Sequence, residues 1–363
     1  MKEYNFNISL SILNHLGRNL YRSFITVLGE AVSNSWDADA QNVYITIDRE
    51  EKELIVRDDG LGMNEDDFQN KFLKIGYSKR KDNMSHTKSG RPFIGRKGIG
   101  KLALLSCAQT ITVLTKNEDS DIVGGVIDNS GLDDAIKDDK NSTDYKLGIP
   151  EEQTIRKYSA ILGSRGTLII FNGIKDGIRN RIDYIRKLVA LYFRFSLKDS
   201  SFNIFINDEI ITLDELSQIK GKTQFAWIIN GIDDPYINDG AFKKKKKISI
   251  DNQQIKGFIA SVETPSDLKI RGTDEKISID LYVNGRLREK DVLRHIPTAR
   301  IVESYLYGQI HFDELDDEND RFTSSREGVV PDDPKFNSFL KELEGLLKTV
   351  INDWDIWRSE INQ

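Results

Sequence analysis

GEAVSNSWDADA, residues 29–40, lies in a segment whose apolar side chains recur every three to four residues, which predicts a helix with one face on a sheet. Asn34 falls on this apolar stripe seven residues after Val27. Glu30 lies one turn before Asn34, so both polar groups share one helix face. A carboxylate and a carboxamide that face a core are costly to bury unless partners await them. The pair therefore predicts a polar site between the helix and the sheet.

A second stretch, ELIVRDDGLGM at residues 53–63, predicts the opposite wall of this site. It begins as a strand in which Leu54, Val56 and Asp58 point to the same side of the sheet. If the two apolar side chains face the helix, Asp58 does so too. It lies at the strand end, where a Gly-x-Gly pair breaks the regular structure.

Two further stretches complete the pattern. IGRKGIGK, residues 94–101, is glycine-rich and runs into the apolar helix LALLSCA. RGTLIIF, residues 165–171, is predicted to be a strand in which Thr167 shares parity with two apolar residues. The order E-x-x-x-N, D-x-G-x-G, G-x-x-G-x-G and a late G-T strand resembles the four boxes of the GHKL ATPases. That family includes gyrase B, the ninety-kilodalton heat-shock chaperones, histidine kinases, MutL and the Microrchidia (MORC) proteins.

The resemblance covers roughly residues 9–215 and implies an α+β fold. We expect a Bergerat-fold, two-layer α/β sandwich that binds ATP over residues 1–215. A smaller, β-rich, transducer-like α/β domain should follow over residues 216–333, where LYVNGR and TSSREGV are the matching pieces. An amphipathic helix over residues 334–363 should pack on the transducer or form part of a dimer interface. The layout is closest to MORC, MutL and the chaperones.

The resemblance also implies chemical roles, with ATP and Mg²⁺ as cofactors. Glu30 would be the general base, and Asn34 would offer its side-chain oxygen to Mg²⁺, a hard cation that takes oxygen ligands. Asp58 would accept a hydrogen bond from the adenine amine, and Thr167 would brace Asp58 through water. Arg326, in TSSREGV, would reach the terminal phosphate from the transducer; the alternative for this arginine is a structural ion pair.

The other expected nucleotide contacts are walls of the base pocket and groups around the phosphates. Glycines let backbone N–H groups approach phosphates, and the helix that starts there adds its dipole. Lys101, at the helix start, is a better phosphate partner than Lys97, and Lys79 is either a phosphate contact or a surface lysine. The expected contacts are Asp37, Ala38, Gly60, Gly62, Met63, Lys79, Gly95, Lys97, Gly98, Ile99, Gly100 and Lys101.

Composition narrows the class of protein. With 363 residues, 38% hydrophobic and 30% charged, the chain is typical of a two-domain globular protein. Cys107 is the single cysteine, which excludes an internal disulfide framework. No apolar run is long enough to span a membrane and the N-terminus lacks a signal-peptide pattern, so we expect a cytoplasmic protein. The net charge of −6 argues against a DNA-coating surface, and Lys243 to Lys247 are expected at a solvated sheet edge.

Other segments carry weaker expectations. Residues 1–13 should be an edge strand or an arm that crosses to a partner subunit. Residues 64–81 should form a helix capped by Asn64, and residues 81–93 a mobile lid. Residues 117–165 should hold a strand or two with long surface connections, and residues 216–245 should be a crossover.

Two functions from different classes remain open. In the first, the chain is an ATP-hydrolysing clamp whose two copies close on ATP, with a protein partner or effector. In the second, it is a nucleotide-gated binding module with little turnover. We find no cleavage domain of a topoisomerase, no metal motif of an endonuclease and no client domain of a chaperone. The layout suggests the ATPase of a multi-protein system, such as one for antiviral defence.

Overall fold

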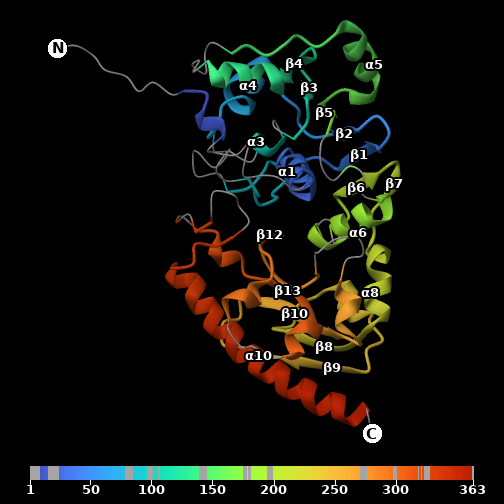
Figure 1. Cartoon of the computed structure of the whole chain (residues 1–363), viewed down its shortest axis with the longest axis vertical. Coiled ribbons are helices and arrows are strands. Elements are labelled where there is room, and N and C mark those ends of the chain that lie inside the picture. Colours follow the sequence, from blue (N-terminus) through green and yellow to red (C-terminus); the bar gives the residue numbers. More distant parts are fainter. Residues whose placement is uncertain are drawn as a thin grey trace, which may run out of the picture. The chain divides into compact units, whose positions relative to one another are not determined.

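A computed structural model of the chain describes residues 9–14, 24–77, 85–95, 101–104, 107–138, 145–174, 178, 181–193, 199–269, 276–296, 301–317, 319, 321–322 and 328–361. The chain forms two compact units, residues 1–189 with 199–211, and residues 190–198 with 212–363. Each unit has its own mixed β-sheet accompanied by helices, so the fold is α+β (Figure 1).

The first unit has a seven-stranded sheet with the order β4-β3-β5-β2-β1-β6-β7. Neighbouring strands are antiparallel, except for the parallel pair β1 and β6. Its strands are β1 (Asn42–Asp48), β2 (Glu53–Asp58), β3 (Thr110–Lys116), β4 (Val123–Asp128), β5 (Gly166–Asn172), β6 (Asn203–Ile206) and β7 (Glu209–Ile210). Its helices are α1 (Phe24–Asp37), α2 (Glu65–Asp67), α3 (Lys101–Leu104), α4 (Asn129–Lys137), α5 (Glu152–Leu162) and α6 (Ile182–Tyr192), the last three residues of which, 190–192, belong to the second unit.

The register of three neighbouring strands positions the polar site. Asp58 of β2 pairs with Thr167 of β5, which pairs in turn with Thr115 of β3. Paired residues share a face, so three polar side chains lie together at one end of the sheet. Val56 and Ile169, two residues along, are buried on the same face. This face carries the core of the first unit, and α1 bonds to it through Ser35.

The opposite face of β3 and β5 is covered by α5. Tyr158 and Leu162 of this helix form a buried cluster with Leu114, Leu168 and Ile170. The sequence analysis was wrong about residues 117–165, because it expected only strands and connections there. Both α4 and α5 are short and rich in polar residues, and each buries only a few apolar side chains, so the periodic signal was weak.

Other local expectations were only partly correct. Asn64 does cap a helix, since its Oδ1 accepts the Asp67 N–H at 2.9 Å, but the helix ends after the π-helical turn Phe68–Phe72. Residues 11–14 turn where a strand was expected, as Ile12 N–H donates to Ser9 O at 3.2 Å. Residues 1–8 lie outside the described part of the chain.

The second unit has a six-stranded sheet with the order β12-β11-β13-β10-β8-β9. Neighbouring strands are antiparallel except for the pairs β11–β13 and β8–β9. The strands are β8 (Thr223–Ile229), β9 (Lys244–Ile248), β10 (Lys256–Val262), β11 (Ile279–Val283), β12 (Arg286–Glu289) and β13 (Leu306–His311), with helices α8 (Ser217–Gly221), α9 (Pro235–Asn238) and α10 (Pro334–Ile361). The predicted crossover at residues 216–245 was wrong, because β8 is a buried strand inside this sheet.

The long helix α10 packs on the sheet of the second unit (Figure 1). The predicted stripe is buried, from Phe336 and Phe339 through Leu343 to Val350. These side chains join Trp227 and other strand residues in one core cluster. The helix therefore packs on the sheet of its own unit, which is one of the two predicted alternatives.

The lysine run forms most of β9, which is an edge strand of this sheet, as predicted. Two of its ammonium groups face acidic side chains of α10, Lys244 with Glu360 and Lys246 with Asp353. Two lysines of the run therefore pair with α10 inside the second unit. Among the described residues, no helix combines the length and the apolar character needed to span a membrane.

Candidate functional site

Helix α1 carries three of the predicted polar residues. Glu30 is only 1% exposed, and Asn34, one turn later, is half-buried. Asp37, near the same end of the helix, is buried. Buried carboxylates are rare in proteins unless they are paired or functional. The structure thus keeps together the acidic and amide groups that the sequence predicts for catalysis and metal binding.

Asp58 lies at the end of β2 on the core face, as its parity predicts. Its Oδ1 accepts the Gly60 N–H at 2.9 Å, and its Oδ2 accepts the Ser35 hydroxyl at 3.0 Å. Burial raises the pKa of Asp58 to about 6, although these two hydrogen bonds lower it. Each carboxylate oxygen can accept two hydrogen bonds, so Asp58 can still accept one from a ligand.

Gly60 and Gly62 are required by close backbone contacts. A Cβ at Gly60 would lie 2.7 Å from Ala38 O and 3.0 Å from Asp58 Oδ1. Gly62 has φ +63°, and a Cβ there would lie 1.8 Å from Lys116 O. The Leu61 N–H also donates to Ala38 O at 2.8 Å. The loop after β2 is therefore pressed against the end of α1, beside Asp58.

Thr115 is a site residue that the sequence analysis missed. This fully buried hydroxyl lies 3.0 Å from Thr167 Oγ1 and accepts the Met63 N–H at 3.0 Å. It also donates to Gly166 O at 3.0 Å. Thr115 joins the G-T strand to the loop after β2. The pattern that identified Asp58 also occurs at Thr115: a polar residue lies on the same face of a strand as buried apolar residues.

Ser35 was also missed. Its hydroxyl lies 3.1 Å from Ala31 O, a helix carbonyl, and 3.0 Å from Asp58 Oδ2. It joins α1 directly to the end of β2. A serine inside a helix often bonds only to its own backbone, so the sequence gave no reason to single it out.

Asp37 anchors the start of the glycine-rich box. Its two carboxylate oxygens accept the Ile94 N–H at 2.8 Å and the Gly95 N–H at 2.9 Å. A Cβ at Gly95 would lie 2.7 Å from Asp37 Oδ2. The sequence assigned Asp37 to the wall of the base pocket. Here its carboxylate fixes the backbone that leads into the glycine-rich box.

The predicted lid is corrected at residues 85–93, which are tied to the first unit. Arg91 is buried, with its guanidinium 4.6 Å from the ring of Trp36 and 5.4 Å from that of Phe202. Its Nη1 donates to Ala40 O at 2.6 Å. A buried, bonded arginine opposes large movement of this stretch. The polar composition of the segment suggested the opposite.

Lys101 has a role different from the predicted one. Its Nζ donates to three backbone carbonyls, Lys71 O at 2.8 Å, Phe72 O at 2.6 Å and Lys74 O at 2.9 Å. A cation at this position satisfies the unpaired carbonyls of a helix end and complements the helix dipole. In this structure the ammonium group holds the helical segment that ends at Phe72.

Several predicted residues lie outside the described part of the chain. They are the four central residues of the glycine-rich box and two isolated basic residues. Their predicted roles remain predictions. These residues are Lys79, Lys97, Gly98, Ile99, Gly100 and Arg326.

The described residues fit a nucleotide and a magnesium ion. A buried carboxylate beside a tight glycine turn suits an adenine amine, and the Gly60 contact leaves no space for a side chain in the turn beside Asp58. No cluster of three or more His, Cys, Asp or Glu residues that could hold a metal occurs among the described residues. Mg²⁺ keeps several waters and uses one or two protein ligands together with phosphates, so a lone amide such as Asn34 is compatible with it.

Fold and site together define a nucleotide-binding ATPase domain. Residues 21–142 match the family described as histidine kinase-, DNA gyrase B- and HSP90-like ATPase. This part of the chain is a domain of the GHKL ATPase family, as the sequence motifs predicted.

The chain is also similar to parts of longer proteins. A putative type II restriction enzyme, HgiDII of Herpetosiphon aurantiacus, is 31% identical over 368 residues, covering 98% of this chain and 57% of that protein. The chaperone protein HtpG of Treponema denticola is 28% identical over 310 residues, covering 76% of this chain and 44% of that protein. HtpG of Oceanobacillus iheyensis is 31% identical over 158 residues, 40% of this chain and 24% of that protein. The chain thus spans about half the length, or less, of these relatives.

Proposed function

We propose that this chain binds ATP with Mg²⁺ in the first unit and hydrolyses it. The observation that carries the proposal is the bond between Ser35 and Asp58. It joins the helix bearing Glu30 and Asn34 to the strand end that would receive adenine. One rigid contact thereby connects the predicted base-recognition, metal-binding and catalytic groups.

Within this proposal each group has one task. Asp58 accepts the adenine amine, and Thr115 with Thr167 supports the wall beside it. Asn34 holds Mg²⁺, which neutralises charge on the phosphates. Glu30, shielded from solvent, accepts a proton from the attacking water.

We further propose that two copies of the chain close on ATP and open after hydrolysis, with Arg326 contacting the terminal phosphate. A role in antiviral defence, as the ATPase of a multi-protein system, is supported by the relative named as a putative restriction enzyme. Nucleic acid would then be handled by a partner protein, because the net charge of this chain is −6 and its lysine run packs within the second unit.

The deciding experiment compares steady-state ATP hydrolysis by the wild-type protein and by Glu30→Ala. A positioned general base contributes roughly 10²–10⁴-fold to a rate, so the variant should bind ATP and turn it over at least about a hundredfold more slowly. Glu51→Ala is a matched control, because Glu51 is an exposed carboxylate in the β1–β2 turn. Equal turnover in Glu30→Ala would exclude Glu30 as the base. Undetectable turnover in the wild type would favour the nucleotide-gated binding module.

A further inference from the structure

Arg91 is a buried, charged residue to which the proposed ATP site gives no task. Its side chain is 9% exposed and lies against the rings of Trp36 and Phe202. Its Nη1 donates to Ala40 O at 2.6 Å, and its Nη2 donates to Ser201 O at 2.9 Å and to Ser201 Oγ at 3.1 Å. The guanidinium group therefore joins the backbone that follows α1 to the backbone that precedes β6.

A side chain needed only for packing would not require this charge. Burying a guanidinium group costs free energy, and an apolar residue of similar size can fill the same space without that cost. Arginine differs from such a residue in direction, because its planar fork of donors bonds to two chain segments at once. The guanidinium group thus fixes where residue 91 lies relative to α1.

Residues 85–93 fold back on themselves around this arginine. The Thr87 N–H donates to Arg91 O at 2.8 Å, and the Arg91 N–H donates to Thr87 Oγ1 at 3.1 Å. In the turn between them, the Ser89 N–H donates to Asp39 Oδ2 at 3.2 Å, two residues after the end of α1. The segment is therefore a short hairpin that is attached to the end of α1 at its turn and at Arg91.

The hairpin leads directly into the glycine-rich box. Each residue from Arg91 to Gly95 forms a hydrogen bond to another part of the first unit. For the last two residues the acceptor is the Asp37 carboxylate, at 2.8 and 2.9 Å. The bonds of the middle two are Trp36 Nε1 to Pro92 O at 3.1 Å and Phe93 N–H to Ser85 O at 3.0 Å. The position of Arg91 therefore sets the direction in which the chain enters the box.

We propose that Arg91 is a positioning residue for the phosphate end of the ATP site. It holds the backbone of residues 91–95, and with it the start of the glycine-rich box, in a fixed orientation before ATP arrives. Donors that are oriented in advance bind an anion without an ordering cost at the moment of binding. The inference rests on the ATP site proposed above, and it separates what holds the phosphates from what holds the adenine.

The adenine end of that site has its own supports. Asp58 accepts the Ser35 hydroxyl at 3.0 Å and the Gly60 N–H at 2.9 Å, and Arg91 takes part in neither bond. Removing the guanidinium group should therefore weaken a nucleotide more, the more phosphates it carries. The contribution of adenine to the affinity should stay unchanged.

The test compares the wild-type protein with Arg91→Met by calorimetry, using AMP, ADP and ATP with Mg²⁺ as separate probes. Methionine keeps an unbranched side chain against the two rings but has no donor. ATP affinity should fall about tenfold or more, ADP affinity less, and AMP affinity least. At saturating ATP, hydrolysis should slow about a hundredfold, because small displacements of groups around a reacting centre have effects of that size. Arg91→Lys keeps the charge without the fork and should recover part of both losses.

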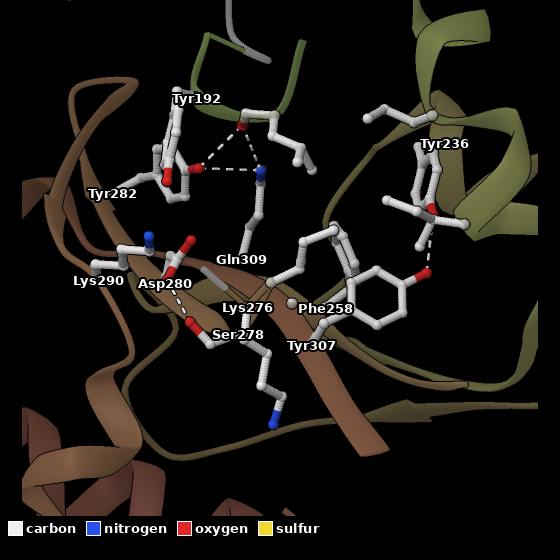
Figure 2. Close-up of a pocket in the computed structure, with 15 residues that line it drawn as sticks. Tyr192, Tyr236, Phe258, Lys276, Ser278, Asp280, Tyr282, Lys290, Tyr307 and Gln309 are labelled. Carbon is white, nitrogen blue, oxygen red and sulfur yellow. Dashed lines mark hydrogen bonds between the residues drawn. The ribbon is translucent and has the colours of Figure 1, made fainter. Parts of the chain in front are cut away.

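Two variants that remove a buried donor elsewhere are the matched controls. Arg186 lies in the first unit with its side chain 12% exposed, and it donates to Glu209 O at 3.1 Å and to Ile210 O at 2.8 Å. Gln309 lies in the second unit, is 5% exposed, and donates from Nε2 to Leu191 O at 3.2 Å (Figure 2). Arg186→Met and Gln309→Met should lower stability without changing the affinity for any of the three nucleotides.

The possible outcomes are distinct. Equal losses for AMP, ADP and ATP in Arg91→Met, or the same graded losses in either control, would overturn the proposal and leave Arg91 with a packing role. Wild-type affinity and turnover in Arg91→Met would overturn it too, while the proposed ATP site would stand. If the wild-type protein binds no ATP, the proposed function fails and the inference fails with it. If Arg91→Met does not fold, the same comparison on Arg91→Lys decides between these outcomes.

Discussion

Replacing Asp58 by asparagine tests the nucleotide site with little disturbance to the fold. The asparagine Oδ1 can still accept the Gly60 N–H, which the aspartate accepts at 2.9 Å. Its Nδ2 would then face the Ser35 hydroxyl. That hydroxyl can accept from Nδ2 and donate instead to Ala31 O, which is 3.1 Å away. The contacts with Gly60 and Ser35 are kept, whereas the ligand loses a charged acceptor.

The size of the effect follows from that asymmetry. A hydrogen bond to a charged group is worth roughly 1.5–3 kcal/mol, and removing it should weaken ATP binding at least about tenfold. Because burial raises the pKa of Asp58, the charged form is unfavourable in the folded state. The variant should therefore be as stable as the wild type, or more stable, at neutral pH.

The measurement is calorimetric titration with Mg-ATP, accompanied by thermal unfolding of both proteins. Ser35→Ala serves as the control, because it removes only the hydroxyl that contacts Asp58 and should affect affinity less. Equal ATP affinity in the wild type and in Asp58→Asn would refute the assignment of Asp58. A large loss of stability in Asp58→Asn would refute the rearrangement described for Ser35.

Three other results are expected. Lys101→Met should lower the free energy of unfolding by about 1–3 kcal/mol, since three carbonyls lose a charged donor; chemical denaturation measures it, and a stable variant with weak ATP binding would restore the predicted phosphate role. Arg326→Ala should slow hydrolysis in a turnover assay while leaving ATP affinity nearly unchanged; an equal loss of both would place the arginine in ground-state binding. Burial raises the pKa of Asp58 to about 6 and that of Asp280 to about 7, both from 3.8. Between the unfolded value of 3.8 and these raised values, the two carboxyl groups bind more protons in the folded chain than in the unfolded chain. The free energy of unfolding should therefore fall as pH rises from about 4 to about 7. Denaturation across that range checks it, and Asp280→Asn should flatten the upper part of the curve.

The sequence predicted the centre of the first unit better than its periphery. Strands such as Asn42–Asp48 and Glu53–Asp58 have one face buried, so alternation revealed both the strand and the side on which Asp58 lies. The stripe of α10 was equally clear. By contrast, TQFAWII in β8 is apolar on both faces because its strand is buried in the sheet. It carries no alternation and was taken for a crossover.

The parts of the site that escaped prediction depend on distant contacts. Arg91 is surrounded by Trp36 and Phe202, which lie 55 residues before it and 111 residues after it in the sequence. Nothing in the local sequence distinguishes it from a surface arginine. Lys101 likewise follows a glycine-rich box, the usual place for a phosphate partner, yet its ammonium group reaches carbonyls about 30 residues earlier. Composition and spacing cannot reveal which of two available acceptors a long side chain will use.

The arrangement of polar residues on α1 limits where the chain can accept an inserted or deleted residue. Glu30, Asn34 and Asp37 lie on one helix, α1, and a helix turns by about 100° per residue. A single inserted residue between Glu30 and Asp37 would swing one end of the set away from its partners while leaving the composition almost unchanged. The exposed turn between β1 and β2 has no such restriction. Insertions and deletions among related sequences should therefore accumulate in that turn and stop at the boundaries of these eight positions.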